Sequence, residues 1–243
     1  MISASSQWRR PLVVATALCL LALSGCRQGD PALPVEESAS SAASASASPT
    51  AEAGADPGAR TALLRVAAAT RALKSYAFTS SQTAGTTVTR LSGRAVRPGT
   101  LTYSLTDAGR TEQIVRINAV TFRRVPPAGY RRLVRSQAQV DPLSSLVKVL
   151  TALKDVSRST GPTGTTFRGT LDGATASAIG LVSGATPTPG VVVPVVLIAD
   201  ANARVTRFTA DVPLRVAGNP VRLQLVTTFT GFNKQPAIKA PRR

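Results

Sequence analysis

Few residues of this sequence could carry acid–base, nucleophilic or metal chemistry. The 243 residues contain no His and only two Cys, with 12 Asp plus Glu against 29 Lys plus Arg. Without imidazole, the chain lacks the usual general base of Ser-His and Cys-His hydrolases and the commonest metal ligand. We therefore expect no enzymatic activity, no metal site and no cofactor.

The remaining patterns with catalytic spacing are weak. Ser145 and Lys148 have the S-x-x-K spacing of penicillin-interacting enzymes, but neither S-D-N nor K-T-G follows. Two pairs of carboxylates flank turns, and turn chemistry accounts for three of the four. These pairs are Asp107 with Glu112 and Asp200 with Asp211. There is no P-loop and no dinucleotide-binding fingerprint. The sequence favours a binding protein over an enzyme.

The N-terminal residues are typical of an export signal. Arg9 and Arg10 precede an apolar run at residues 11–23, which is too short to span a bilayer as a stable helix. Leu23-Ser24-Gly25-Cys26 resembles the lipobox of bacterial lipoproteins. By this resemblance, residues 1–25 are a signal peptide and Cys26 becomes the N-terminus, acylated with chains such as palmitate. The alternatives are an ordinary secretory signal and an uncut anchor.

The signal peptide and lipobox together predict a lipid-anchored protein on the extracytoplasmic face of the cell membrane. Residues 26–59 are rich in Ser, Ala and Pro and poor in large apolar residues, so we expect a disordered tether. Residues 60–243 form the domain. Because Cys19 is removed with the signal, the mature chain keeps one cysteine and cannot form an internal disulfide.

The domain is strongly basic. Residues 60–243 hold 26 cations and seven acids, a net charge of +19, mostly from Arg. Such a field attracts polyanions, which outside a cell membrane means anionic lipid headgroups or cell-wall polymers. The alternative is a solvated surface without a function. We expect no nucleic-acid partner, because the sequence has no zinc-finger spacing and no basic segment with interleaved aromatics.

Hydrophobic periodicity predicts an α+β fold. Residues 60–74 have apolar side chains at helical spacing, and in a second helix Asp141 is the N-cap, Pro142 the first residue, and Leu143, Leu146, Val147, Leu150 and Leu153 form the stripe. Elsewhere the period is two, with turn signals between the runs. The predicted strands are residues 76–78, 88–96, 101–105, 111–117, 120–122, 165–171, 191–198, 205–211, 214–216 and 221–229. One curved antiparallel sheet of about ten strands, a half-barrel with helices on its concave face, covers every apolar stripe.

The order of several short segments resembles the actinobacterial LppX, LprA, LprF and LprG lipoprotein family. These segments are the lipobox, residues 75–79, the run 120–124 leading into Tyr130-Arg131, the Asp141-Pro142 helix and the tail 229–241. The resemblance implies a fold similar to the LolA and LolB carriers, with an apolar cavity that takes up acyl chains of a lipid or lipoglycan. It also implies an envelope transporter or acceptor protein as a partner. We expect a monomer.

Small interior residues would leave room for such a guest chain. The expected cavity lining is Phe78, Tyr103, Phe122, Leu146, Leu150, Phe167, Ile179, Leu181, Val195 and Leu197. Five arginines that cluster before the second helix are candidates for binding a phosphate or carboxylate headgroup. They are Arg123, Arg124, Arg131, Arg132 and Arg135. The alternative is a filled core, with polyanions or partner proteins bound by the Arg-rich exterior.

Overall fold

The computed structural model describes residues 57–133, 141–181, 186–187, 190–216 and 219–241. The predicted signal peptide, Cys26, Arg135 and almost all of the predicted tether lie outside these ranges. The described residues form three helices, α1 (Pro57–Arg71), α2 (Pro142–Ala152) and α3 (Gly173–Ala178). Their strands are β1 (Ser75–Ala84), β2 (Thr87–Val96), β3 (Thr100–Asp107), β4 (Arg110–Ile117), β5 (Val120–Arg124), β6 (Arg131–Leu133), β7 (Lys154–Gly161), β8 (Gly164–Asp172), β9 (Thr186–Pro187), β10 (Val192–Ala199), β11 (Val205–Val216) and β12 (Asn219–Thr230).

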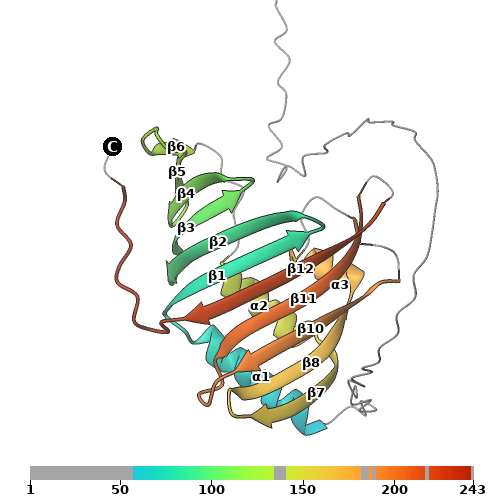
Figure 1. Cartoon of the computed structure of the whole chain (residues 1–243). Coiled ribbons are helices and arrows are strands. Elements are labelled where there is room, and N and C mark those ends of the chain that lie inside the picture. The colour runs from blue at the N-terminus through green and yellow to red at the C-terminus, as the bar shows by residue number, and fades with distance from the viewer. Residues whose placement is uncertain (1–56, 134–140, 182–185, 188–189, 217–218, 242–243) are drawn as a thin grey trace, which may run out of the picture. The chain divides into compact units, whose positions relative to one another are not determined.

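All the described strands belong to one antiparallel sheet. Its order is β6-β5-β4-β3-β2-β1-β12-β11-β10-β8-β7, and β9 pairs with β11 beside this path. β1 and β12, from opposite ends of the domain, are neighbours in the middle of the sheet. Figure 1 shows the sheet curving around α1 and α2, which lie on one of its faces. The single curved sheet confirms the predicted fold class.

The second predicted helix is confirmed at its start. Asp141 is the N-cap of α2, and its side chain accepts a hydrogen bond from the Leu143 backbone N–H at 3.0 Å. The Tyr76 hydroxyl donates to the same carboxylate, and Arg97 pairs with it at 3.0 Å. Burial raises the pKa of Tyr76, and the charge of Asp141 raises it further. One carboxylate therefore fastens α2 to β1 and to the residue after β2.

The first helix overlaps its predicted range but begins at Pro57 and ends at Arg71. Arg60 on its first turns donates from its guanidinium to the carbonyl oxygens of Thr151 at 2.7 Å and Leu153 at 2.8 Å. These are carbonyls at the end of α2, which helices leave without an intrahelical partner. The start of α1 is thus joined to the end of α2.

The chain after β12 is fixed against the start of β1. The Asn233 side-chain oxygen accepts from the Lys74 backbone N–H at 2.8 Å, and the Asn233 N–H donates to the Ser75 carbonyl at 2.7 Å. The Gln235 backbone N–H donates to the Ser75 hydroxyl at 3.1 Å. The first part of the predicted family tail therefore closes over the loop between α1 and β1.

Several elements differ from the prediction. β6, β7 and α3 lie in segments for which no helix or strand was predicted. β7 has a single buried side chain, Val156, so it shows no apolar alternation. β11 runs through Pro213 as one strand. It pairs with β10 up to Ala210 and with β9 from Leu214 onward, so the missing N–H of Pro213 falls between the two partners.

Among the described residues, no helix has the length and apolar character needed to cross a bilayer.

Candidate functional site

Strand register shows which side chains share the face of the sheet that α2 covers. Tyr76 contacts the start of α2, so Phe78, two residues later on β1, lies on the same face. Phe78 is opposite Gly93 on β2, and Gly93 is opposite Tyr103 on β3. Directly opposite residues point to the same side of a sheet. We call this side the inner face.

The same row continues to two of the predicted headgroup arginines. Tyr103 is opposite Ile114 on β4, Ile114 is opposite Arg123 on β5, and Arg123 is opposite Arg131 on β6. Arg131, on the edge strand β6, and Arg123, on the adjacent strand β5, therefore lie on the inner face in line with buried aromatic residues. Cationic and apolar side chains thus meet in one continuous row.

The other predicted arginines are placed differently. Arg124 and Arg132 are each one residue from an inward arginine and so lie on the outer face. The Arg124 guanidinium donates to the Ala128 carbonyl at 3.2 Å and lies 5.9 Å from the Tyr130 ring centre. Arg131 and Arg132 are exposed, and Arg135 lies outside the described residues. The predicted cluster is divided between two faces.

Arg123 is held by a carboxylate on the neighbouring strand. Its Nε donates to Glu112 Oε2 at 2.8 Å, and a second guanidinium nitrogen binds Glu112 Oε1. This hydrogen bonding raises the pKa of Arg123. Burial raises the pKa of the neighbouring Tyr103 to about 12, with a further contribution from Glu112. The ion pair closes the edge of the inner face beside Tyr103.

The predicted cavity lining is mostly core. Seven of its ten residues are at most 7 % exposed and belong to one buried cluster, and Ile179 and Leu181 are half-buried against it. The seven are Phe78, Tyr103, Leu146, Leu150, Phe167, Val195 and Leu197. Phe122 is opposite Val115 and Arg132 and lies on the outer face, away from the others. The prediction for Phe122 is wrong because a one-residue change of register reverses the face of a strand residue.

Other apolar residues of the inner face are less covered. Leu105 is opposite Leu91 and Glu112, and Ile114 lies in the row of Tyr103. Leu91, Leu105 and Ile114 are all half-buried and pack against the edge of the core. Sequence reasoning missed them as candidates, although Leu105 continues the alternation of Leu101 and Tyr103. They form a partly open apolar surface between the core and Arg123.

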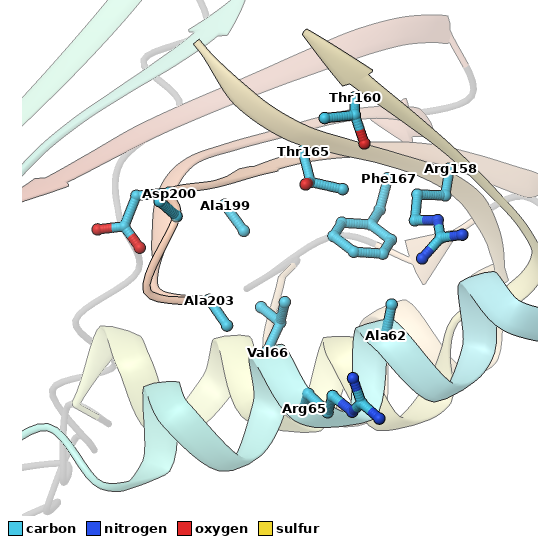
Figure 2. A pocket seen from close by; sticks show the side chains of 11 residues that line it. Ala62, Arg65, Val66, Arg158, Thr160, Thr165, Phe167, Ala199, Asp200 and Ala203 are labelled. Atoms are coloured by element: carbon cyan, nitrogen blue, oxygen red, sulfur yellow. The ribbon is translucent and has the colours of Figure 1, made fainter. Parts of the chain in front are cut away.

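A separate pocket of about 200 Å³ opens beside α1. Its lining comes from α1, from β7 and β8, and from the turn between β10 and β11, as Figure 2 shows. Phe167 is the one residue of the predicted lining among those that surround it. The volume is below the range of about 300 to 1,000 Å³ usual for ligand sites. This pocket is too small for a long acyl chain.

The four carboxylates considered for catalysis each have another partner. Asp107 accepts from the Thr89 hydroxyl, and Glu112 binds Arg123. The other two form ion pairs: Asp200 with Arg204 at 2.6 Å and Asp211 with Arg222 at 3.6 Å. Within the described part of the chain, no three or more His, Cys, Asp or Glu side chains are grouped as metal ligands.

Comparison with known proteins found similarity at the level of structure. No protein-family model and no curated protein matches the sequence. The structure of LprF from Mycobacterium bovis aligns with a TM-score of 0.53 and 13% identity, over 76% of this chain and 98% of LprF. Mycobacterium tuberculosis lipoprotein LppX aligns at 0.37 with 14% identity, over 76% and 100% of the two chains. A DUF1329 family protein from Desulfovibrio piger aligns at 0.28 with 8% identity, over 75% and 94%.

The likeness to LprF concerns the fold. At 13% identity, the alignment shows that the two chains share an architecture. The other two TM-scores are too low to support an argument. Together with the sheet order, the comparison confirms the predicted LolA-like half-barrel, a curved antiparallel sheet with helices on its concave face.

Proposed function

We propose that this chain is an envelope lipoprotein of the LppX, LprA, LprF and LprG type, anchored to the cell membrane through an acylated Cys26. Its domain, on the extracytoplasmic face, holds acyl chains of a lipid or lipoglycan and carries or presents that lipid. It acts as a monomer that exchanges its cargo with an envelope transporter or acceptor protein. The lipobox and the likeness of the fold to LprF support this proposal.

The observation that carries the proposal is the inner-face row that joins apolar and cationic side chains. The half-buried Leu91, Leu105 and Ile114 offer surface to an acyl chain, and each CH₂ buried there contributes about 0.8 kcal/mol. Arg123 and Arg131 lie on the same face, on the last two strands of the sheet. A chain laid along Leu105 and Ile114 would place its anionic headgroup beside the exposed Arg131, whose guanidinium suits phosphate and carboxylate, while Arg123 is already bound by Glu112.

Mass spectrometry of the full chain from an actinobacterial host tests both parts of the proposal. The denatured protein should carry a covalent mass increment of acyl size on Cys26. The native protein should carry a further lipid-sized mass that is lost on denaturation. Equal native and denatured masses in every preparation would contradict lipid binding, and an unmodified Cys26 would contradict the anchor.

Two neighbouring residues of β3 provide a matched pair of variants. Leu105 lies on the inner face and Ser104 on the outer face, and both are half-buried. Leu105→Gln should reduce the lipid-bound fraction several-fold, because the amide must be desolvated beneath an acyl chain. Ser104→Gln should retain it. Circular dichroism checks that both variants are folded, and an equal loss in both would contradict binding on the inner face.

The charge of the domain supports a second candidate function, a surface module that binds polyanions. Even if each of the seven acids in residues 60–243 neutralises one cation, 19 positive charges remain. Such a module would have a filled core and no bound lipid. The lipid carrier should show the noncovalent lipid-sized mass described above, whereas the polyanion-binding module should not.

A further inference from the structure

The hairpin between β5 and β6 has an uncharged tip between two pairs of arginines. Residues 123–132 read RRVPPAGYRR and contain no acid. Arg123 on β5 is opposite Arg131 on β6, so the two pairs lie at the base of the hairpin. β6 is an edge strand, and Figure 1 shows this hairpin at the top of the sheet, with α1 and β7 at the bottom. We call residues 125–129 the hairpin tip.

The hairpin tip is apolar and open to solvent. Residues 125–129 are all exposed, and none of them carries a charge or a polar side chain. Val125 is 44% exposed, and the other large apolar side chains that are exposed in the described part of the chain are Leu64 and Val192. Burying the surface of the tip in an apolar phase would therefore be favourable.

The backbone of the hairpin tip needs few hydrogen-bond partners from outside. Pro126 and Pro127 have no backbone N–H. The Ala128 N–H donates to the Val125 carbonyl at 3.0 Å, and the Ala128 carbonyl accepts from the Arg124 guanidinium at 3.2 Å. Unpaired backbone groups are what makes an irregular loop costly to remove from water. Because several of these groups are absent or already paired, this tip can leave water at a small cost.

Contacts at its base hold the hairpin in place. The Arg123 guanidinium is bound by Glu112, and the Arg124 guanidinium, besides its bond to the tip, lies 5.9 Å from the Tyr130 ring centre. The Tyr130 hydroxyl donates to Gln113 Oε1 on β4 at 3.1 Å. These two arginines therefore have structural partners, and the tip is a fixed projection from the sheet.

The other two arginines present cations on both faces of the hairpin. Arg131 lies on the inner face and Arg132 on the outer face, and both are exposed. A surface that received the tip would meet one guanidinium on each side of it. Guanidinium groups form charge-assisted hydrogen bonds with phosphate oxygens. The hairpin thus combines an apolar end with two cations suited to phosphate.

We propose that this hairpin docks the domain on the surface of an anionic lipid bilayer. The hairpin tip enters the interface, and Arg131 and Arg132 bind lipid phosphates from its two sides, where each cation adds to the attraction. Docking needs neither a bound cargo nor an acylated Cys26. It turns the Arg131 end of the inner-face row toward the bilayer.

A tryptophan placed in the hairpin tip tests the proposal. The one Trp of the sequence is Trp8, in the predicted signal peptide, so the parent chain serves as the emission blank. Ala128→Trp places an indole in the tip. Thr163→Trp is the matched control, because Thr163 is exposed in the turn between β7 and β8, at the other edge of the sheet. The full chain of each variant is reconstituted into phosphatidylglycerol vesicles and, separately, into phosphatidylcholine vesicles, both with brominated acyl chains as the quencher.

We expect the emission of Ala128→Trp to shift to shorter wavelength and to be quenched on phosphatidylglycerol vesicles. The docked fraction should fall at about 500 mM salt, which screens the arginines. Thr163→Trp should keep the emission of an indole in water. Equal quenching of the two variants would show a domain without a fixed orientation, and equal quenching of Ala128→Trp on both lipids would show that anionic charge is not recognised. Either result, or an unquenched Ala128→Trp, overturns the proposal.

An arginine variant in the Ala128→Trp background tests the role of charge. Arg132→Gln should lower the docking constant about fivefold, through loss of one cation near an anionic surface. Arg65→Gln is the control, because Arg65 is also exposed but lies on α1. An equal effect of the two substitutions would contradict docking through the hairpin.

A charge placed in the tip tests the role of its apolar surface. Val125→Asp should lower the docking constant about tenfold, because the carboxylate must be desolvated at an anionic surface. Val192→Asp on β10 is the control, since Val192 is 59% exposed, and it should retain docking. Circular dichroism checks that both variants are folded. The lipid-sized native mass should be unchanged in Val125→Asp, so failures of docking and of lipid binding are measured separately.

Discussion

Tyr103 is the residue at which the chemistry of the inner face can be measured directly. It lies in the row between Gly93 and Ile114 and is 7% exposed. Burial raises its pKa to about 12, and the carboxylate of Glu112 adds to the effect. Burial favours the neutral phenol in the folded state. The pH at which Tyr103 ionises therefore shows whether its hydroxyl is buried.

The raised pKa of Tyr103 predicts a loss of stability at high pH. Tyr103 in the unfolded chain ionises near pH 10, whereas the folded protein retains its proton up to about pH 12. The stability that comes from the shift is therefore complete below pH 10 and is lost as the pH rises toward 12, by about 2 to 3 kcal/mol.

Urea unfolding between pH 9 and pH 12 measures this loss. The slope of the unfolding free energy against pH should be smaller in Tyr103→Phe than in the parent chain, since phenylalanine cannot ionise. Tyr130→Phe is the control, because Tyr130 lies in the loop between β5 and β6. An unchanged slope in Tyr103→Phe would show that this hydroxyl is not buried.

At the scale of elements, Gly93 on β2 allows the close approach of Tyr103 on β3 in the inner-face row. A Cβ on Gly93 would lie 2.5 Å from the Cβ of Tyr103 and would also collide with the Thr102 carbonyl. The absence of a side chain at Gly93 lets the Cβ of Tyr103 come close to the backbone of β2. A glycine here is required by close approach and not by an unusual backbone angle.

Gly93→Ala should therefore destabilise the domain. The colliding atoms include backbone, which cannot rotate away, so we expect a loss of about 1 to 3 kcal/mol in the free energy of unfolding. Gly129→Ala is the matched control, because no atom lies within 4 Å of the position that a Cβ on Gly129 would take. Thermal unfolding of both variants checks the prediction. Equal unfolding midpoints would contradict a close contact between Gly93 and β3.

How far the elements could be predicted depends on how much of each strand is buried. The α2 helix was predictable because Asp141, Pro142 and the leucine stripe are all local signals. The strands from β1 to β5 alternate and are separated by turn residues. β7 could not be predicted in this way, since it is an edge strand whose side chains are mainly exposed. Its place depends on pairing with β8.

The candidate sites depend on information that local patterns do not hold. The register of strand pairing places Arg123 and Arg131 on the inner face. It places Arg124 and Arg132 on the outer face. For the same reason, alternation within β5 could not say that Phe122 faces outward. The pocket beside α1 joins residues 62–66, 158–167 and 199–203, so it exists only after the fold has formed.

At the scale of the whole molecule, the distribution of charge separates two kinds of lipid contact. The excess of 19 cations in residues 60–243 favours the surface of an anionic bilayer, and this attraction acts on the exterior of the domain. Acyl chains held on the inner face are instead retained by apolar contact. Surface attraction is screened by salt, whereas buried apolar contact is not weakened by it.

Salt should therefore separate the two contacts in one preparation. Residues 53–243, which form a compact unit, should sediment with phosphatidylglycerol vesicles at about 50 mM salt and be released at about 500 mM. Arg132→Glu with Arg168→Glu, both exposed on the outer face, should weaken this sedimentation, because each exposed cation near an anionic surface contributes about 1 kcal/mol. Lipid carried on the inner face should remain bound through the same salt wash. If salt removed that lipid together with the vesicles, the cargo would be a surface contact and the polyanion-binding module would be the better description of the protein.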